Sequence, residues 1–313
     1  MNISENKDKY SQYYTTKNPF KYDAIHSWVG DSAKSGISIS EPFYGAGDLM
    51  THFKDTFKIK NAKYNYYDIE PSSEEVVYND SLKNIPKCDL IITNPPYGHT
   101  STIHKTGIDR ATLGGFSNVY LKALDTCLLA SENVLAIIPA SFISDGSFRD
   151  RIHSLVIPTE LLFNDTEVPI VLAMFTKDGS DNPGVYSGNK LIGYLNDILK
   201  IHNEILGDEV PESPKGKEHN MMLACIDSPN KKAHFKVWDG RDCKGSRAFF
   251  SFYTELTIEE LNNRLESYRR KTGDILLCPF RGYRKDGGYR MRISFKNSQT
   301  VNLPLIIRSI IRF

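Results

Sequence analysis

The tetrapeptide Asn94-Pro95-Pro96-Tyr97 follows a short apolar run at residues 88–93, and no other feature of the sequence constrains the fold as strongly. An apolar run of this length predicts a buried parallel strand. The two prolines fix the backbone after the strand and donate no N–H, so the carbonyls of the turn are available as acceptors. Asn94 adds a side-chain acceptor and Tyr97 adds a flat aromatic face. This set suits a planar substrate that carries an NH2 group, although proline pairs also end strands without any further role.

A glycine-containing turn lies upstream, between a predicted strand at residues 37–41 and a helix that begins near Leu49. Gly45 and Gly47 permit a tight turn and a close approach of the backbone to a ligand. Open α/β sheets bind nucleotides at turns in this place. The turn lacks the third glycine of a dinucleotide fingerprint and the Gly-Lys-Ser/Thr of a phosphate-binding loop, which argues against NAD and ATP.

Two acidic residues follow in an order that fits a nucleotide site. Asp68 ends the strand predicted at residues 63–68, where α/β nucleotide sites place a carboxylate on ribose hydroxyls. Asp80 precedes the strand that leads to Asn94, and its carboxylate is an acceptor for an adenine amino group. Either acid alone is more often a solvated loop residue, but in order with the two turns they indicate a ligand site.

Together these motifs resemble the adenine-N6 DNA methyltransferases, which use S-adenosyl-L-methionine, over roughly residues 10–177. Residues 43–47 look like the cofactor glycine motif of that family, and Asn94-Pro95-Pro96-Tyr97 matches its catalytic motif. The order of cofactor motif, catalytic motif and C-terminal recognition region is similar to the family's γ arrangement. The resemblance implies these residues for binding S-adenosyl-L-methionine: Thr15, Glu41, Phe43, Gly45, Gly47, Asp68, Ile69, Asp80 and Ser81.

The chemistry of the family accounts for these residue types. The N6 lone pair of adenine is conjugated into the ring, so acceptors aimed at both N–H bonds localise it and stabilise the developing positive charge. We assign these acceptors to Asn94 Oδ1 and the Pro95 carbonyl. The adenine has to leave the duplex and lie between aromatic or apolar faces. The resemblance implies Tyr97 for one face and Phe163 for the other, although a buried core aromatic explains Phe163 equally well.

The net charge of +1 conceals two regions of opposite charge. Residues 1–230 hold 21 Lys/Arg and 30 Asp/Glu, whereas residues 231–313 hold 18 Lys/Arg and 8 Asp/Glu. A basic C-terminal region beside an acidic catalytic region is typical of nucleic-acid enzymes. In it, arginines and aromatics flank Asp286-Gly287-Gly288, which predicts a hairpin.

The candidate DNA contacts lie in this hairpin and in a loop predicted to be mobile at residues 98–117. We expect Arg284 and Arg290, nearer the hairpin tip, to read bases, and the other hairpin arginines to hold phosphates or structure. The full set is Lys105, Arg110, Arg281, Arg284, Arg290 and Arg292.

Alternating strands and helices predict an α/β fold, a Rossmann-like methyltransferase sheet that is mostly parallel with helices on both faces. A smaller C-terminal α+β target-recognition domain follows. We expect a catalytic domain at 1–206, a linker at 207–220 and a basic DNA-recognition domain at 221–313. The predicted helices lie near 20–30, 48–55, 117–131, 190–206 and 257–271, and the predicted strands near 37–41, 63–68, 88–93, 133–138, 158–163 and 168–176.

Several classes of protein fit the sequence poorly. No apolar run approaches a membrane span, and residues 1–10 lack a signal-peptide core, so we expect a cytoplasmic enzyme acting on DNA. The 5 cysteines include no Cys-x-x-Cys pair, and the histidines show no ligand spacing, so no metal is expected. No cysteine has the Pro-Cys setting of the cytosine-C5 methyltransferase nucleophile.

The sequence thus favours a site-specific, adenine-specific DNA methyltransferase of a restriction–modification type, with double-stranded DNA as partner. A cognate restriction endonuclease sharing the recognition site is a further candidate partner. Three alternatives stay open: adenine methylation of structured RNA, glutamine methylation of a release factor, and an inactive subunit that only binds nucleic acid. The basic hairpin and the Phe43-containing glycine motif argue against the release-factor alternative, and the intact Asn94 turn argues against an inactive subunit.

Overall fold

The computed structural model describes these residues: 15–98, 108–160, 162–163, 170–206, 220–223, 235–237, 250–261, 263, 281–283 and 289–291. The chain divides into two compact units, one of residues 1–166 and 170–193 and one of residues 167–169 and 194–313. The predicted linker at 207–220 lies outside the described residues except for Asn220, so the domain boundaries stay a prediction.

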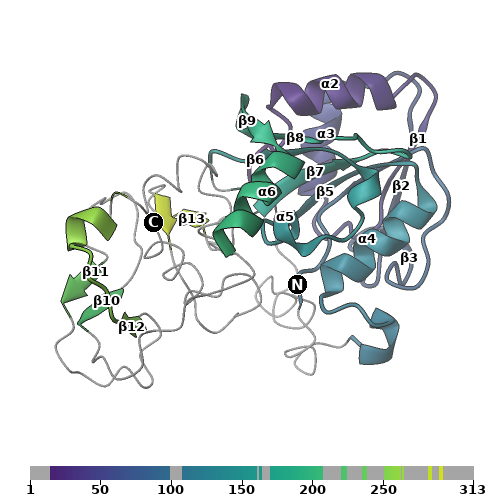
Figure 1. The fold of residues 1–313 in the computed structure, drawn as a ribbon. Helices are drawn as coiled ribbons and strands as arrows, with labels where there is room; N and C mark the ends of the chain where they lie inside the picture. Colours follow the sequence, from purple (N-terminus) through teal and green to yellow (C-terminus); the bar gives the residue numbers. More distant parts are fainter. Residues whose placement is uncertain are drawn as a thin grey trace. The chain divides into compact units, whose positions relative to one another are not determined.

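The first unit is built on a nine-stranded sheet with the order β3-β2-β1-β4-β5-β7-β6-β8-β9 (Figure 1). The strands β1 to β5 pair in parallel, whereas β7 runs antiparallel to both β5 and β6. This arrangement confirms the predicted mostly parallel, Rossmann-like sheet. The strands are β1 (Ser38–Glu41), β2 (Lys63–Asp68), β3 (Val76–Tyr78), β4 (Leu90–Thr93), β5 (Asn133–Pro139), β6 (Ile152–Ile157), β7 (Ile170–Phe175), β8 (Gly184–Ser187) and β9 (Lys190–Tyr194).

Helices cover both faces of this sheet, as predicted. α2 and α3 lie on one side of the sheet, and α4 and α5 lie on the other (Figure 1). The apolar side chains of α2 and α3 share one buried cluster with alternate residues of the central strands, among them Leu90, Ile92 and Leu135. The helices are α2 (Asp23–Ser32), α3 (Asp48–Phe57), η2 (Arg110–Leu113), α4 (Val119–Ala130), α5 (Phe142–Asp145) and η3 (Arg149–Arg151).

The central strands are buried on both faces, which explains their continuous apolar sequences. All four residues of β4 and all six residues of β7 are buried. Within the described residues, no helix is long and apolar enough to span a bilayer.

Two of the sequence predictions of secondary structure are wrong. The strand predicted at 158–163 lies six residues earlier, at β6, because the polar pair His153-Ser154 obscures the strand pattern and Pro158 follows its last residue. The helix predicted at 190–206 begins only at Leu195, because residues 190–194 form β9. Leu191 and Tyr194 continue the apolar spacing of the helix α6 (Leu195–Leu206), so the sequence alone did not separate strand from helix.

The second unit contains α6 and two small antiparallel sheets. One sheet joins β11 (Phe235–Val237), β10 (Met221–Leu223) and β12 (Phe250–Phe252). The other joins β13 (Arg281–Tyr283) and β14 (Tyr289–Met291), with Gly282 opposite Arg290. This pairing confirms the predicted hairpin, while the turn residues 284–288 lie outside the described residues. Of the helix predicted at 257–271, residues 258–261 and 263 are described and helical.

Candidate active site

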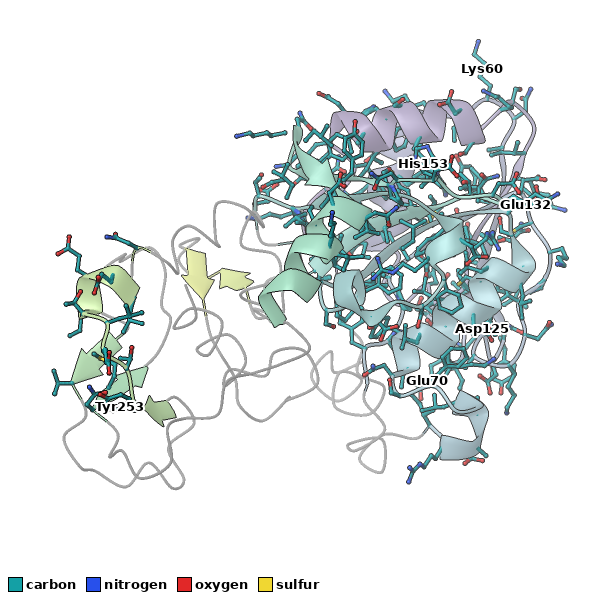
Figure 2. The ribbon with its side chains drawn as sticks, viewed as in Figure 1. Lys60, Glu70, Asp125, Glu132, His153 and Tyr253 are labelled. Atoms are coloured by element: carbon teal, nitrogen blue, oxygen red, sulfur yellow. The ribbon has the colours of Figure 1, made fainter. Side chains whose placement is uncertain are left out.

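The candidate site lies at the edge of the sheet where the parallel strands β1, β2 and β4 end. Figure 2 labels Glu70, which follows β2, and Glu132, which precedes β5; parallel pairing puts these two residues at opposite edges. The glycine turn follows β1, Asp68 ends β2 and Asn94 follows β4. Because the carboxyl ends of parallel strands meet at one edge, the fold brings the sequence motifs together.

The glycine turn after β1 is held by backbone conformation and by Asp68. Gly45 and Gly47 have φ values of 55° and 84°, which glycine adopts at little cost. The Gly45 N–H donates to Asp68 Oδ2 at 2.8 Å, and the Glu70 N–H donates to Asp68 Oδ1 at 2.9 Å. The Tyr44 side chain lies against Gly47, where a Cβ would come within 2.5 Å of Tyr44 Oη.

Asp68 is therefore a buried carboxylate that ties β2 to the glycine turn. It is 3% exposed, and burial raises its pKa, while the backbone N–H groups of Glu70 and Gly45 act in the opposite direction. The structure thus gives Asp68 a positioning role that the sequence did not predict. Its predicted contact with ribose stays a prediction.

Glu41 is the most unusual carboxyl group of the site. It is 1% exposed, and burial raises its pKa well above the ordinary value of 4.5. Glu41 Oε1 accepts hydrogen bonds from Thr93 Oγ1 at 2.8 Å and from the Phe43 N–H at 3.2 Å. Within the described part of the chain, Glu41 Oε2 is buried without a hydrogen-bond partner. A buried oxygen of this kind is costly unless a ligand supplies the missing donor.

The turn after β4 is held by side chains. Tyr97 Oη lies 2.8 Å from Asn94 Oδ1 and 2.9 Å from the backbone oxygen of Ile137 in β5. At its other end, the Asn94 amide donates from Nδ2 to Thr15 Oγ1 at 3.3 Å. Thr15 is 3% exposed, so a residue from the N-terminal segment holds the amide of the predicted catalytic residue.

A single pocket of the described residues contains most of the predicted cofactor residues and Asn94. Its lining includes Thr15, Glu41, Phe43, Gly45, Gly47 and Asn94. Asp68, Ile69, Asp80 and Ser81 lie outside this lining. Asp80 pairs with Lys83 at 2.9 Å, and Ser81 is 3% exposed. Ile69, 38% exposed, offers an apolar surface next to Asp68.

Phe163 lies beside Tyr97 but not parallel to it. The two ring centroids are 6.4 Å apart with planes at 74°, an edge-to-face contact, and Phe163 is 2% exposed in the core. Phe163 would have to move for the two rings to enclose a base, so its stacking role stays a prediction.

Part of the loop that was predicted to be mobile, residues 98–117, packs in a buried cluster near Phe43. Residues 99–107, including Lys105, lie outside the described residues. The described remainder includes η2, whose Leu113 is buried with Leu82 in a cluster that Phe43 also contacts. Arg110 is exposed on η2. Of the hairpin arginines, Arg284 and Arg292 lie outside the described residues, and Arg281 and Arg290 are described only as strand positions.

Thr93, the Ile137 carbonyl and Tyr44 are among the contributors to the site that the sequence did not assign individually. Thr93 carries a hydroxyl that bonds Glu41, and its position directly before Asn94 was the available signal. The Ile137 carbonyl has no sequence signal, because every residue carries one. Tyr44 lines the pocket and covers Gly47. In the described part of the chain, no group of three or more His, Cys, Asp or Glu residues could hold a metal ion.

Comparison with known proteins gives one sequence relative and several similar structures. The chain is 29% identical over 141 residues to the modification methylase CviBIII of Paramecium bursaria Chlorella virus NC1A, a match to 41% of this chain and 37% of that protein. The chain therefore spans little more than a third of its relative. No protein-family model matches.

Two solved structures are among those that match this chain. A type I restriction-modification system methyltransferase subunit from Streptococcus thermophilus is 14% identical, with a TM-score of 0.43 over 55% of this chain and 46% of that one. A DrdV–DNA complex is 12% identical, with a TM-score of 0.45 over 60% of this chain and 29% of that one. The chain carries a Rossmann-like, mostly parallel α/β sheet and is similar over part of its length to a protein named as a modification methylase.

Proposed function

We propose that this protein transfers a methyl group from S-adenosyl-L-methionine to N6 of a flipped adenine in a specific double-stranded DNA sequence. The observation that carries the proposal is the pocket in which Glu41, the glycine turn and Asn94 meet. Glu41 and the glycine turn fit the cofactor, and the Asn94 turn fits an amino group. The relative named as a modification methylase supports the same reaction class.

The pocket suits the charge of the cofactor. Glu41 Oε2 is a buried acceptor without a partner in the described residues, and the amino-acid end of S-adenosyl-L-methionine carries an ammonium group. A charge-assisted hydrogen bond would satisfy this oxygen. Gly45 and Gly47 leave their Cα atoms bare, so a ligand can approach the backbone closely. Four residues at or just after the carboxyl ends of β2 and β3 are assigned to the ribose and adenine end of the cofactor: Asp68, Ile69, Asp80 and Ser81.

The Asn94 turn acts on the attacking amine. The cofactor supplies the methyl group on a sulfonium, a leaving group that needs no general acid. The N6 lone pair would form the new N–C bond as the C–S bond breaks with its electron pair going to sulfur, and one N–H proton would then leave to water. Asn94 Oδ1 and the Pro95 carbonyl accept from the amine and stabilise its positive charge, while Pro96 keeps the turn rigid. Tyr97 offers its ring to the base.

We assign DNA recognition to the second unit, because it carries the basic part of the chain and the β13–β14 hairpin. Arg284 and Arg290 are assigned to bases and Arg281 and Arg292 to phosphates, with Lys105 and Arg110 touching the backbone from the loop beside the site. Substitution of a phosphate-contacting arginine by alanine should weaken binding to all duplexes and reduce the salt slope by about one unit. Substitution of a base-reading arginine should cost about 1–3 kcal/mol on the recognition site alone.

A transfer assay with tritiated S-adenosyl-L-methionine tests the function. Purified protein is offered double-stranded DNA, structured RNA and release-factor protein, and labelled product is digested and identified. We expect N6-methyladenine in DNA and no label with the Asn94→Ala variant. Label in RNA or on glutamine would replace the proposed substrate with one of those alternatives. Methylation-sensitive sequencing of DNA from expressing cells then gives the recognition site, which a cognate restriction endonuclease would share.

A further inference from the structure

We infer that the hydroxyl group of Tyr97 is a positioning group that orients the Asn94 amide, in addition to any stacking by its ring. This inference rests on the proposed function, because it assigns a task to a residue of the same site. It concerns an oxygen atom that stacking does not require, since phenylalanine offers the same ring face.

The geometry places the Asn94 amide between two hydroxyl groups. Tyr97 Oη is 2.8 Å from Asn94 Oδ1, and Thr15 Oγ1 is 3.3 Å from Asn94 Nδ2. The Asn94 amide is therefore gripped at both ends, and its rotation about the terminal torsion, which is soft in a free asparagine, is restricted. The Tyr97 ring packs against the buried Phe163 and the hydrophobic core cluster to which Phe163 belongs.

The Tyr97 hydroxyl has one proton to donate and two acceptors within hydrogen-bond distance. A phenol carries one proton, whereas both oxygens near Tyr97 Oη, Asn94 Oδ1 and the Ile137 carbonyl, are acceptors. The hydroxyl can donate fully to only one of them at a time. Asn94 Oδ1 carries two lone pairs, so it can accept from Tyr97 Oη and from an amino group at the same time, and the hydroxyl keeps Oδ1 oriented toward the amine.

A purely structural role for the hydroxyl predicts a different result. If it only anchors the ring to Ile137, its loss lowers stability or base affinity and acts independently of Asn94. If it positions the Asn94 amide, its loss lowers the rate of transfer and has no effect once the amide is gone. The two roles are therefore separable by a double-mutant cycle.

The experiment measures single-turnover methyl transfer at saturating cofactor for Tyr97→Phe, Asn94→Ala and the double variant. The acceptor is whichever of DNA, RNA or protein the wild type methylates, so failure of the DNA assignment is seen separately from failure of this inference. We expect Tyr97→Phe to slow transfer roughly 2- to 12-fold, the effect of one neutral hydrogen bond, with unchanged cofactor and substrate affinity. In the Asn94→Ala background, Tyr97→Phe should have no further effect.

Tyr22→Phe is the matched control. Tyr22 Oη also has a backbone partner, although it accepts from the Thr159 N–H at 3.2 Å where Tyr97 Oη donates to a carbonyl, and Tyr22 is buried in the core outside the pocket lining. This control should lower stability without slowing transfer. Thr15→Val, which removes the hydroxyl that accepts from Asn94 Nδ2, should lower the rate more than Thr15→Ser, which keeps a hydroxyl. An equal slowing by Tyr97→Phe with and without Asn94 would overturn the inference.

A second measurement does not depend on activity. The side-chain amide signals of Asn94, identified by their loss in Asn94→Ala, report its hydrogen bonds by NMR. The chemical shifts of these signals should change in Tyr97→Phe and should not change in Tyr22→Phe. Unmoved signals in Tyr97→Phe would also overturn the inference.

Discussion

The two turns that meet at the candidate site are held by different means. The glycine turn after β1 is fixed by positive φ angles at Gly45 and Gly47 and by the hydrogen bond that the backbone N–H of Gly45 donates to the Asp68 carboxylate. The turn after β4 is fixed by side-chain bonds of Asn94 to Tyr97 and Thr15. A turn fixed through its backbone should lose cofactor affinity or stability when altered, whereas a turn fixed through side chains should lose rate while the fold stays intact.

The largest effect should come from Asn94→Ala in the side-chain-held turn. It removes one preorganised acceptor, which costs about 2.7–4 kcal/mol, or roughly 100- to 1000-fold in rate. Cofactor affinity and melting temperature should change little. Asn133→Ala, at the opposite edge of the sheet, is the matched control and should leave the rate unchanged. Near-normal turnover by the purified Asn94→Ala protein would remove Asn94 from the mechanism.

The carboxyl group of Glu41 should show the next largest effect, on cofactor affinity. Glu41→Gln keeps the shape but removes the charge, which should weaken binding by about 1.5–3 kcal/mol. Because burial raises the pKa of Glu41, affinity for the cofactor should increase with pH in the wild type below the pKa of the cofactor's own amine, and stay flat in the variant. Calorimetric titration across a pH series measures the cofactor affinity of the wild type and of Glu41→Gln. If the two affinities changed with pH in the same way, Glu41 would not bind the ammonium group of the cofactor.

The raised pKa of Glu41 also predicts how the stability of the cofactor-free protein depends on pH. The folded protein binds the Glu41 proton more tightly than the unfolded chain, so stability falls as pH rises from the ordinary value of 4.5 toward the raised pKa. Without cofactor, Glu41→Gln should therefore lose less stability than the wild type over this range. Urea unfolding without and with cofactor tests it.

Asp68 joins the two strands that carry the cofactor site. Asp68→Ala removes acceptors from the Gly45 and Glu70 N–H groups, so cofactor affinity should fall by about 1.5–3 kcal/mol, with a smaller change in rate at saturation. Asp68→Asn keeps one side-chain acceptor, so its cofactor affinity should lie between the affinities of the wild type and of Asp68→Ala. Unchanged affinity in the alanine variant would show that the glycine turn does not need this carboxylate.

The difference between the two turns also explains what the sequence could predict. Pro95, Pro96, Gly45 and Gly47 set the local backbone, so both turns and their strands were predicted correctly. The bond of Asn94 to Thr15 joins residues 79 apart, and the bond of Tyr97 to Ile137 uses a backbone carbonyl, so neither has a local pattern. The tilt of Phe163 against Tyr97 depends on core packing, which one sequence does not specify.

The smallest effect should be the difference in stability loss between Gly47→Ala and Gly36→Ala. This difference separates backbone strain from the contact of an added Cβ with Tyr44. Gly47 and Gly36 have nearly the same φ, 84° and 82°, so alanine at either position should cost about 1–2 kcal/mol of stability from backbone strain. Around Gly36 nothing lies within 4 Å of an added Cβ, whereas at Gly47 it meets the Tyr44 ring. Gly47→Ala should therefore exceed Gly36→Ala by roughly 1 kcal/mol, the low end of overpacking costs, because the half-buried Tyr44 ring can move. Gly47→Ala alone should also weaken cofactor binding. Equal losses of stability and unchanged affinity in both variants would show that Tyr44 does not shape the pocket.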